Sequence, residues 1–149
     1  MTEPSGADLT WMAVAIEWSR RCPFVPDRFN VGAVVVADGQ ELEHGYSRDV
    51  NPHMHAEESA LSRLSGVDLT GATIYTSMEP CTIRASHPRT CTQLILASGI
   101  TRVVYAIREP SFLVECDGVE QLTAAGLTVI ETPSLAAEVR AVNAHIPWS

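Results

Sequence analysis

The chain has 149 residues, of which 46% are hydrophobic, so it can bury the core of a single compact domain. No stretch is long and apolar enough to cross a membrane, and we expect no membrane partner. The formal net charge is −8, and all ten basic residues are arginines, scattered except for the pair Arg20-Arg21. A nucleic-acid backbone needs a basic stripe, so this pattern disfavours a nucleic-acid partner.

The N-terminal third predicts a helix followed by a hairpin. Residues 1–8 are small and polar, and we expect them to form a loose arm on a single domain that spans residues 1–149. Apolar residues repeat at helical spacing after Asp8, a plausible N-cap, and Pro23 closes the run, which predicts a helix over residues 9–21. A β-branched strand over residues 31–36, a turn at Asp38-Gly39 and a strand over residues 41–46 follow.

The rest of the chain alternates helices and strands. Asn51-Pro52 breaks the chain before a helix that begins at His55 and stops at Gly66. The later elements are expected as a strand over 73–76, a helix over 91–98, a strand over 103–107, a helix over 119–125, a strand over 127–130 and a helix over 135–145. This alternation predicts an α/β fold, a three-layer α/β/α sandwich around a mixed five-stranded sheet.

Three residues have the composition of a catalytic zinc site. One imidazole, from His55, and two thiolates, from Cys81 and Cys91, would leave the fourth position of a tetrahedral Zn²⁺ open for water. Glu57, two positions beyond His55, points to a different side of the helix and can take the water's proton without binding the metal. H-x-E followed by P-C-x-x-C is the pattern of zinc deaminases, although nine residues, Thr82 to Thr90, separate the two cysteines here.

Other interpretations of these residues stay open. Cys81 and Cys91 could form a disulfide, but the N-terminus has no basic segment followed by an apolar run and no cleavage signal, so a reducing, cytoplasmic location is expected. A closed structural zinc site would need a fourth ligand, for which His53 is the candidate. Such a site, or a reversible Cys81–Cys91 couple, would make the protein a non-catalytic zinc-stabilised or redox module.

From Gly32 to about Glu131 the chain resembles the cytidine deaminase-like superfamily. It is most similar to the deaminase domain of the riboflavin-biosynthesis deaminase/reductase, which acts on a diaminopyrimidinone ribosylamino phosphate. The stretches that carry the resemblance are Val31-Gly32-Ala33-Val34-Val35, His55-Ala56-Glu57, Ala72-Thr73-Ile74-Tyr75, Met78-Glu79-Pro80-Cys81, Gly99-Ile100-Thr101-Arg102-Val103-Val104, Gly118-Val119, Leu122 and Ala125-Gly126-Leu127.

The resemblance implies a zinc-dependent hydrolytic deaminase with assigned roles. His55, Cys81 and Cys91 would be the zinc ligands, and Glu57 the proton shuttle. Asn30 and the backbone N–H of Ala56 would hold the substrate, with His53 at the pocket mouth. A basic residue of the inter-cysteine loop would help to hold the ribose phosphate, and Arg84, His87 and Arg89 are the candidates. Asn30 is alternatively a turn residue, and Arg84 and Arg89 are alternatively solvated loop charges.

Departures from the family pattern leave the substrate open. The chain has no room for a reductase domain, and Arg89-Thr90 replaces the family's Pro-Pro before the second cysteine. A stand-alone riboflavin-pathway deaminase, a cytidine or deoxycytidylate deaminase and a deaminase of a specialised aminopyrimidine are the alternatives. The expected partner is a small aminopyrimidine or nucleotide-like molecule. Relatives of this fold commonly form homodimers or higher homo-oligomers, and the same is expected here.

Overall fold

One five-stranded mixed sheet organises the protein. The computed structural model describes residues 3–82, 88–108 and 116–148. The strand order is β2-β1-β3-β4-β5; β1 runs antiparallel to both of its neighbours, whereas β3, β4 and β5 are parallel. The elements are α1 Gly6–Ser19, β1 Gly32–Ala37, β2 Gln40–Tyr46, α2 Ala56–Ser62, β3 Thr73–Met78, α3 Cys91–Ser98, β4 Arg102–Ile107, α4 Gly118–Ala124, β5 Thr128–Glu131, a 3₁₀ turn Pro133–Leu135 and α5 Ala136–Val142.

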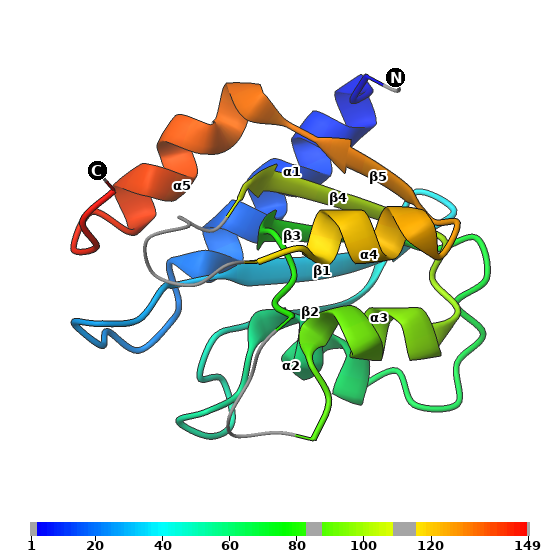
Figure 1. The fold of residues 1–149 in the computed structure, drawn as a ribbon, viewed down its shortest axis with the longest axis horizontal. Helices are drawn as coiled ribbons and strands as arrows, with labels where there is room; N and C mark the ends of the chain where they lie inside the picture. Colours follow the sequence, from blue (N-terminus) through cyan, green and yellow to red (C-terminus); the bar gives the residue numbers. More distant parts are fainter. Residues whose placement is uncertain (1–2, 83–87, 109–115, 149) are drawn as a thin grey trace.

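Helices cover both faces of this sheet (Figure 1). On one face α1 and α5 pack over a core that includes Met12, Ile16 and Val139. On the other face α2, α3 and α4 enclose a second core that includes Ile95 and Leu122. Successive side chains of a strand point to opposite faces, so each buried strand supplies both cores. The predicted three-layer α/β/α sandwich with a mixed five-stranded sheet is confirmed.

Because β1 runs opposite to β2, β3 and β4, its first residue lies at the end of the sheet that the carboxyl ends of those three strands form. Gly32 at the start of β1 pairs with Tyr46 at the end of β2, and the Gly32 N–H donates to Ser77 Oγ near the end of β3 at 3.1 Å. Met78 at the end of β3 pairs with Ile107 at the end of β4. The residues that precede β1 and those that follow β2, β3 and β4 therefore meet at this end of the sheet.

The first helix begins earlier than predicted, and the expected arm over residues 1–8 is wrong from Ser5 onward. Ser5 is the N-cap of α1 and forms a capping box with Asp8, whose side chain accepts from the Ser5 N–H at 2.9 Å. Asp8 is buried and accepts two hydrogen bonds from Arg102, both at 2.7 Å, and one from the Tyr75 hydroxyl at 2.8 Å. This network joins the first turn of α1 to β3 and β4, which an unordered arm could not do.

The other boundaries mostly agree with the predictions. Helix α3 has the predicted bounds and ends at Gly99, whose φ of 90° is in the left-handed region that favours glycine. Helix α2 is shorter than predicted and begins at Ala56, with His55 as its N-cap. The last helix is also shorter, because Pro133 starts a 3₁₀ turn and the helix proper ends at Val142.

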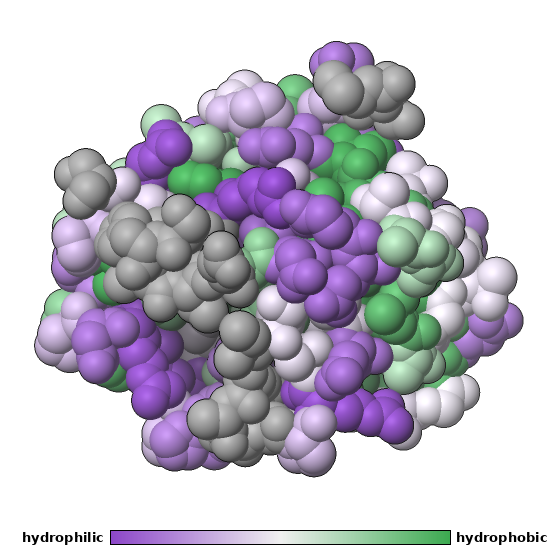
Figure 2. All heavy atoms as spheres, viewed as in Figure 1, coloured by the Kyte–Doolittle hydropathy of each residue, from purple (hydrophilic) through white to green (hydrophobic). Residues whose placement is uncertain are grey.

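The surface is mixed in polarity on the face that Figure 2 shows. In the described parts of the chain, no helix has both the length and the apolar character needed to span a bilayer. Hydrophilic side chains dominate over α4 on the face shown in Figure 2, and hydrophobic side chains reach this surface only in separate patches.

The buried Asp8–Arg102 pair should make stability depend on pH. The Arg102 hydrogen bonds hold the pKa of Asp8 well below its ordinary value, so its stabilising contribution is complete above about pH 4 and is lost as the pH falls further. We expect Asp8→Asn to lower the free energy of unfolding by about 2–4 kcal/mol at pH 7, because Arg102 loses its counter-charge. The difference from wild type should narrow below about pH 4.

Urea titration at pH 7 and pH 3 measures both effects. Glu17→Gln is the matched control, because Glu17 lies on the same helix in an exposed pair with Arg20. It should change stability by less than about 1 kcal/mol. An equal loss for the two variants at pH 7 would contradict the role given to Asp8.

Candidate active site

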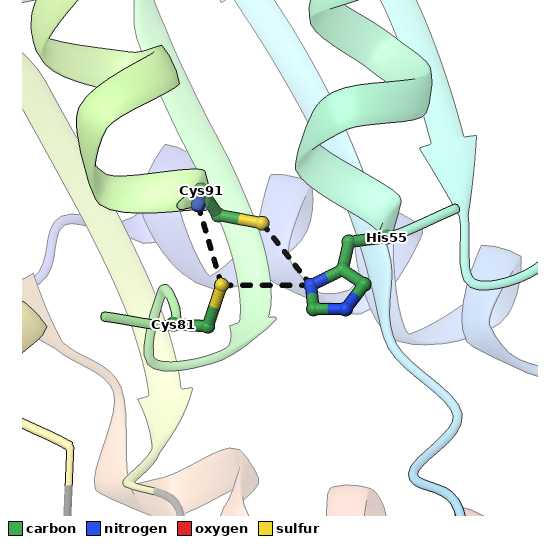
Figure 3. Close-up of side chains that lie close together, drawn as sticks. All are labelled: His55, Cys81 and Cys91. Carbon is green, nitrogen blue, oxygen red and sulfur yellow. Dashed lines mark hydrogen bonds between the residues drawn. The ribbon is translucent and has the colours of Figure 1, made fainter. Parts of the chain in front are cut away.

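His55, Cys81 and Cys91 lie close together at the end of the sheet where β3 ends (Figure 3). His55 Nδ1 lies 3.5 Å from Cys81 Sγ and 3.3 Å from Cys91 Sγ, and all three potential ligand atoms lie within 4.8 Å of one another. No disulfide bond joins Cys81 to Cys91. Of the residues the structure describes, His53 does not join this group, which leaves three protein ligands.

The donor set and its spacing fit a zinc ion. A tetrahedral zinc with one nitrogen and two sulfur ligands places its nitrogen and sulfur atoms about 3.5 Å apart. The two nitrogen-to-sulfur distances, 3.3 and 3.5 Å, agree with that value. The three ligand candidates found among the described residues would leave one position open, which is the arrangement of catalytic zinc sites, since structural sites are closed by a fourth protein ligand.

The first turn of α3 binds Cys81 despite the long separation along the chain. The Cys91 N–H donates to Cys81 Sγ at 3.2 Å, and the Thr92 N–H and hydroxyl both donate to the Cys81 carbonyl oxygen, at 3.2 and 2.9 Å. Thr90 caps this helix through its side chain. Hydrogen bonds from the Cys91 thiol and from His55 lower the pKa of the Cys81 thiol, which favours the thiolate that metals bind.

His55 is held by the start of α2. It is the N-cap residue, and its N–H donates to the Glu58 carboxylate at 3.2 Å in a capping box. Strand β2 packs directly on this helix at Gly45, where a Cβ atom would lie 2.5 Å from the Ala56 carbonyl oxygen. Only glycine allows so close an approach, and it fixes the position of the His55-Ala56-Glu57 turn against the sheet.

Glu57 is a buried carboxyl group beside the three ligands, with only 4% of its surface exposed. Burial, followed by the charge of the Cys81 thiolate, raises the pKa of Glu57 to about 7. A carboxyl group with a pKa near neutrality can both accept and donate a proton under physiological conditions. Glu57 also lines the cavity described next, so its proton can reach a bound molecule.

A cavity of about 390 Å³ opens next to the ligand group. Of the residues predicted to bind substrate, His53 and Ala56 line it together with Cys81. Ala56 is the first residue of α2, where backbone N–H groups have no carbonyl partner within the helix. The wall also includes residues that sequence reasoning did not single out, among them Asp27, Arg28 and Arg48.

The remaining predicted substrate residues lie elsewhere. Asn30 is buried but is not among the residues that line the cavity. Arg89 lines a separate depression with Leu61 and Leu94, between α2 and α3. Arg84 and His87 fall outside the described residues.

Glu79 is a second buried carboxylate at the site, and its role is structural. It accepts hydrogen bonds from Arg108 Nε at 3.3 Å, from Arg108 Nη2 at 3.0 Å and from the Val119 N–H at 3.1 Å. These bonds connect the end of β3 to the residue after β4 and to the start of α4. Motif spacing could not reveal this, because Arg108 and Val119 are 29 and 40 positions from Glu79.

Comparison with known proteins agrees with this geometry. Residues 5–107 match the model of the cytidine and deoxycytidylate deaminase zinc-binding region. The chain belongs to this deaminase family. All three zinc-ligand candidates and Glu57 lie inside the matched region.

Individual deaminases of this family resemble most of the chain. A diaminohydroxyphosphoribosylamino-pyrimidine deaminase of Schizosaccharomyces pombe is 38% identical over 125 residues, which are 81% of this chain and 31% of that protein. One from Buchnera aphidicola is 32% identical over 91% of this chain and 90% of its own length. The structure of a Thermotoga maritima deaminase/reductase superposes with a TM-score of 0.80 and 36% identity, covering 91% of this chain and 39% of that one. The chain thus spans about a third of the S. pombe relative.

The Glu79–Arg108 pair should support metal binding through Cys81. Glu79→Gln keeps the size of the side chain but leaves Arg108 without a buried counter-charge. We expect zinc affinity to fall by about 10- to 100-fold, as is typical when a group that orients a metal ligand is changed. Competition with a zinc chelator measures this loss.

Glu120→Gln provides the control, because Glu120 contacts the same arginine from the exposed side. Its zinc affinity should stay within about threefold of wild type, since exposed ion pairs contribute little. Unchanged zinc affinity in Glu79→Gln would show that Cys81 is positioned without this pair.

Proposed function

We propose that the protein is a zinc-dependent hydrolytic deaminase of an aminopyrimidine, with a diaminopyrimidinone ribosylamino phosphate as its substrate. The observation that carries the proposal is a three-ligand His/Cys/Cys group beside a buried carboxyl group in the wall of a cavity. A purely structural zinc site or a redox pair has no use for a buried carboxyl group at that position. The diaminohydroxyphosphoribosylamino-pyrimidine deaminases that resemble the chain support the choice of substrate.

Each residue of the site has a defined task in this mechanism. His55, Cys81 and Cys91 would hold the zinc ion, which supplies the Lewis acidity that makes water nucleophilic near neutral pH. Glu57 takes a proton from the attacking water and delivers it to the amino group that leaves the ring as ammonia. The Ala56 N–H, at the start of α2, is placed to donate to a ring carbonyl oxygen.

Substrate class is tested by measuring ammonia release from a panel of aminopyrimidines. The panel contains the diaminopyrimidinone ribosylamino phosphate, cytidine, deoxycytidylate and cytosine. Turnover of the diaminopyrimidinone alone supports the proposal. Turnover of deoxycytidylate or cytidine instead would assign the chain to the other activity that the family description names.

Removal of the proton shuttle should abolish turnover without removing the metal. Glu57→Gln preserves shape, so zinc content should stay at the wild-type level while ammonia release falls by about 100-fold or more. Glu58→Gln is the neighbouring control, because glutamine also satisfies a capping box at that position. Near-normal turnover by Glu57→Gln would contradict the assigned mechanism.

Loss of one thiolate should remove the metal. Cys91→Ala leaves two protein ligands, and we expect zinc content after dialysis to fall to less than about a tenth of the wild-type value. Cys22→Ala removes a half-buried cysteine outside the ligand group and should keep its zinc. Full zinc occupancy in Cys91→Ala would mean that the long inter-cysteine connection does not deliver a ligand.

A further inference from the structure

Arg48 is a buried cation in the wall of the active-site cavity. It follows β2 by two residues and is only 8% exposed. Its φ is 60°, a left-handed conformation that non-glycine residues rarely adopt, and its N–H donates to the Met54 carbonyl oxygen at 2.7 Å. Met54 directly precedes His55, so the backbone of Arg48 is bound to the segment that carries a zinc-ligand candidate. Unusual backbone conformations of this kind concentrate at functional sites.

The guanidinium group of Arg48 contacts neutral acceptors. Its Nε donates to the Pro23 carbonyl oxygen at 3.0 Å, its Nη1 to the Phe29 carbonyl oxygen at 3.1 Å and its Nη2 to Asn30 Oδ1. A guanidinium group has five N–H donors, so these three bonds leave two N–H groups for other acceptors. Within residues 3–82, 88–108 and 116–148 no carboxylate forms an ion pair with Arg48.

Other arginines that anchor the fold are compensated by carboxylates. Arg63 pairs with Asp49, Arg102 with Asp8 and Arg108 with Glu79, and in each case the carboxylate raises the pKa of the arginine. Burial instead lowers the pKa of Arg48. A buried charge without a counter-charge is costly, so its presence in a cavity wall suggests that a ligand supplies the missing negative charge.

Asn30 supports Arg48 and does not itself face the cavity. Its backbone N–H donates to Asn143 Oδ1 at 2.6 Å, and its carbonyl oxygen accepts from Asn143 Nδ2 at 3.1 Å. Arginine can only donate, so the Asn30 side chain must turn its oxygen towards Arg48. Two asparagines and two backbone carbonyl groups thus hold the guanidinium in one orientation at the cavity.

We propose that Arg48 binds the phosphate group of the substrate; the exposed pair Asp27 and Arg28 lines the same cavity with one charge of each sign. This assignment rests on the proposed function, because it concerns the phosphorylated tail of the deaminated molecule. A planar guanidinium presents paired donors that match the oxygens of a phosphate. Arg89, an earlier candidate for this role, lines a different depression.

Binding of ribose 5-phosphate to the zinc-loaded protein tests the proposal without turnover. Calorimetry should show binding of ribose 5-phosphate that exceeds that of ribose by at least 10-fold. Arg48→Gln should reduce the affinity for ribose 5-phosphate at least 10-fold, and Arg48→Lys should lose less, because it keeps the charge. Arg20→Gln, at an exposed surface pair, should bind as wild type does.

A second variant separates binding from folding. Asn30→Asp places a carboxylate against the guanidinium and neutralises it within the protein. We expect this variant to keep or raise the wild-type melting temperature while losing at least 10-fold in ribose 5-phosphate affinity. If Arg48 only fastened the preceding loop to the end of β2, the new ion pair would leave ligand binding unchanged, and that result would overturn the proposal.

Kinetics distinguish this proposal from the proposed function. For Arg48→Gln, KM for the phosphorylated diaminopyrimidinone should rise at least 10-fold with kcat within about threefold of wild type. The dephosphorylated compound should show the same KM in both proteins. Equal losses for the two compounds would refute a phosphate contact. Absence of any deamination would refute the proposed function but leave the ribose 5-phosphate result valid.

Discussion

The contact between the first turn of α3 and Cys81 is the constraint on which the metal site depends. Three donors from Cys91 and Thr92 reach the sulfur and the carbonyl oxygen of Cys81. These bonds fix the relative positions of the two cysteines, although nine residues separate them in the sequence. The Cys91 N–H, at the start of this helix, also favours the thiolate form of Cys81 that a metal requires.

The topology of the sheet determines which residues lie near the metal site. Because β1 is antiparallel to β2 and β3, the start of β1 and the end of β2 lie at the edge where β3 delivers Cys81. An all-parallel sheet would place the start of β1 at the opposite edge. The reversal therefore brings Asn30, which precedes β1, to the end of the sheet where Arg48 follows β2 and Cys81 follows β3. A single cavity there is lined both by Glu57 and by Arg48.

Local sequence signals predicted the features that depend on neighbours in the chain. Helix α3 followed from its apolar spacing and Gly99, and the ligand group followed from residue types that together suit only a few purposes. The start of α1 was missed because Asp8 was interpreted as a cap, whereas its partners Arg102 and Tyr75 are 94 and 67 positions away. Arg48 was missed for the same reason, since its acceptors come from a segment 18 to 25 residues earlier.

Buried charges in this protein fall into two groups with different physical roles. Asp8 and Glu79 are neutralised inside the protein by Arg102 and Arg108, and these pairs connect elements that are distant in sequence. Glu57 and Arg48 have no such ion pair among the described residues, and both line the cavity. A charge that is neutralised by an ion pair within the fold can stabilise the fold but is not available to bind a ligand. Burial of Glu57 is relieved when it takes up a proton near neutral pH, whereas the charge of Arg48 can be compensated by a bound anion, which is why both belong to the chemistry of the site.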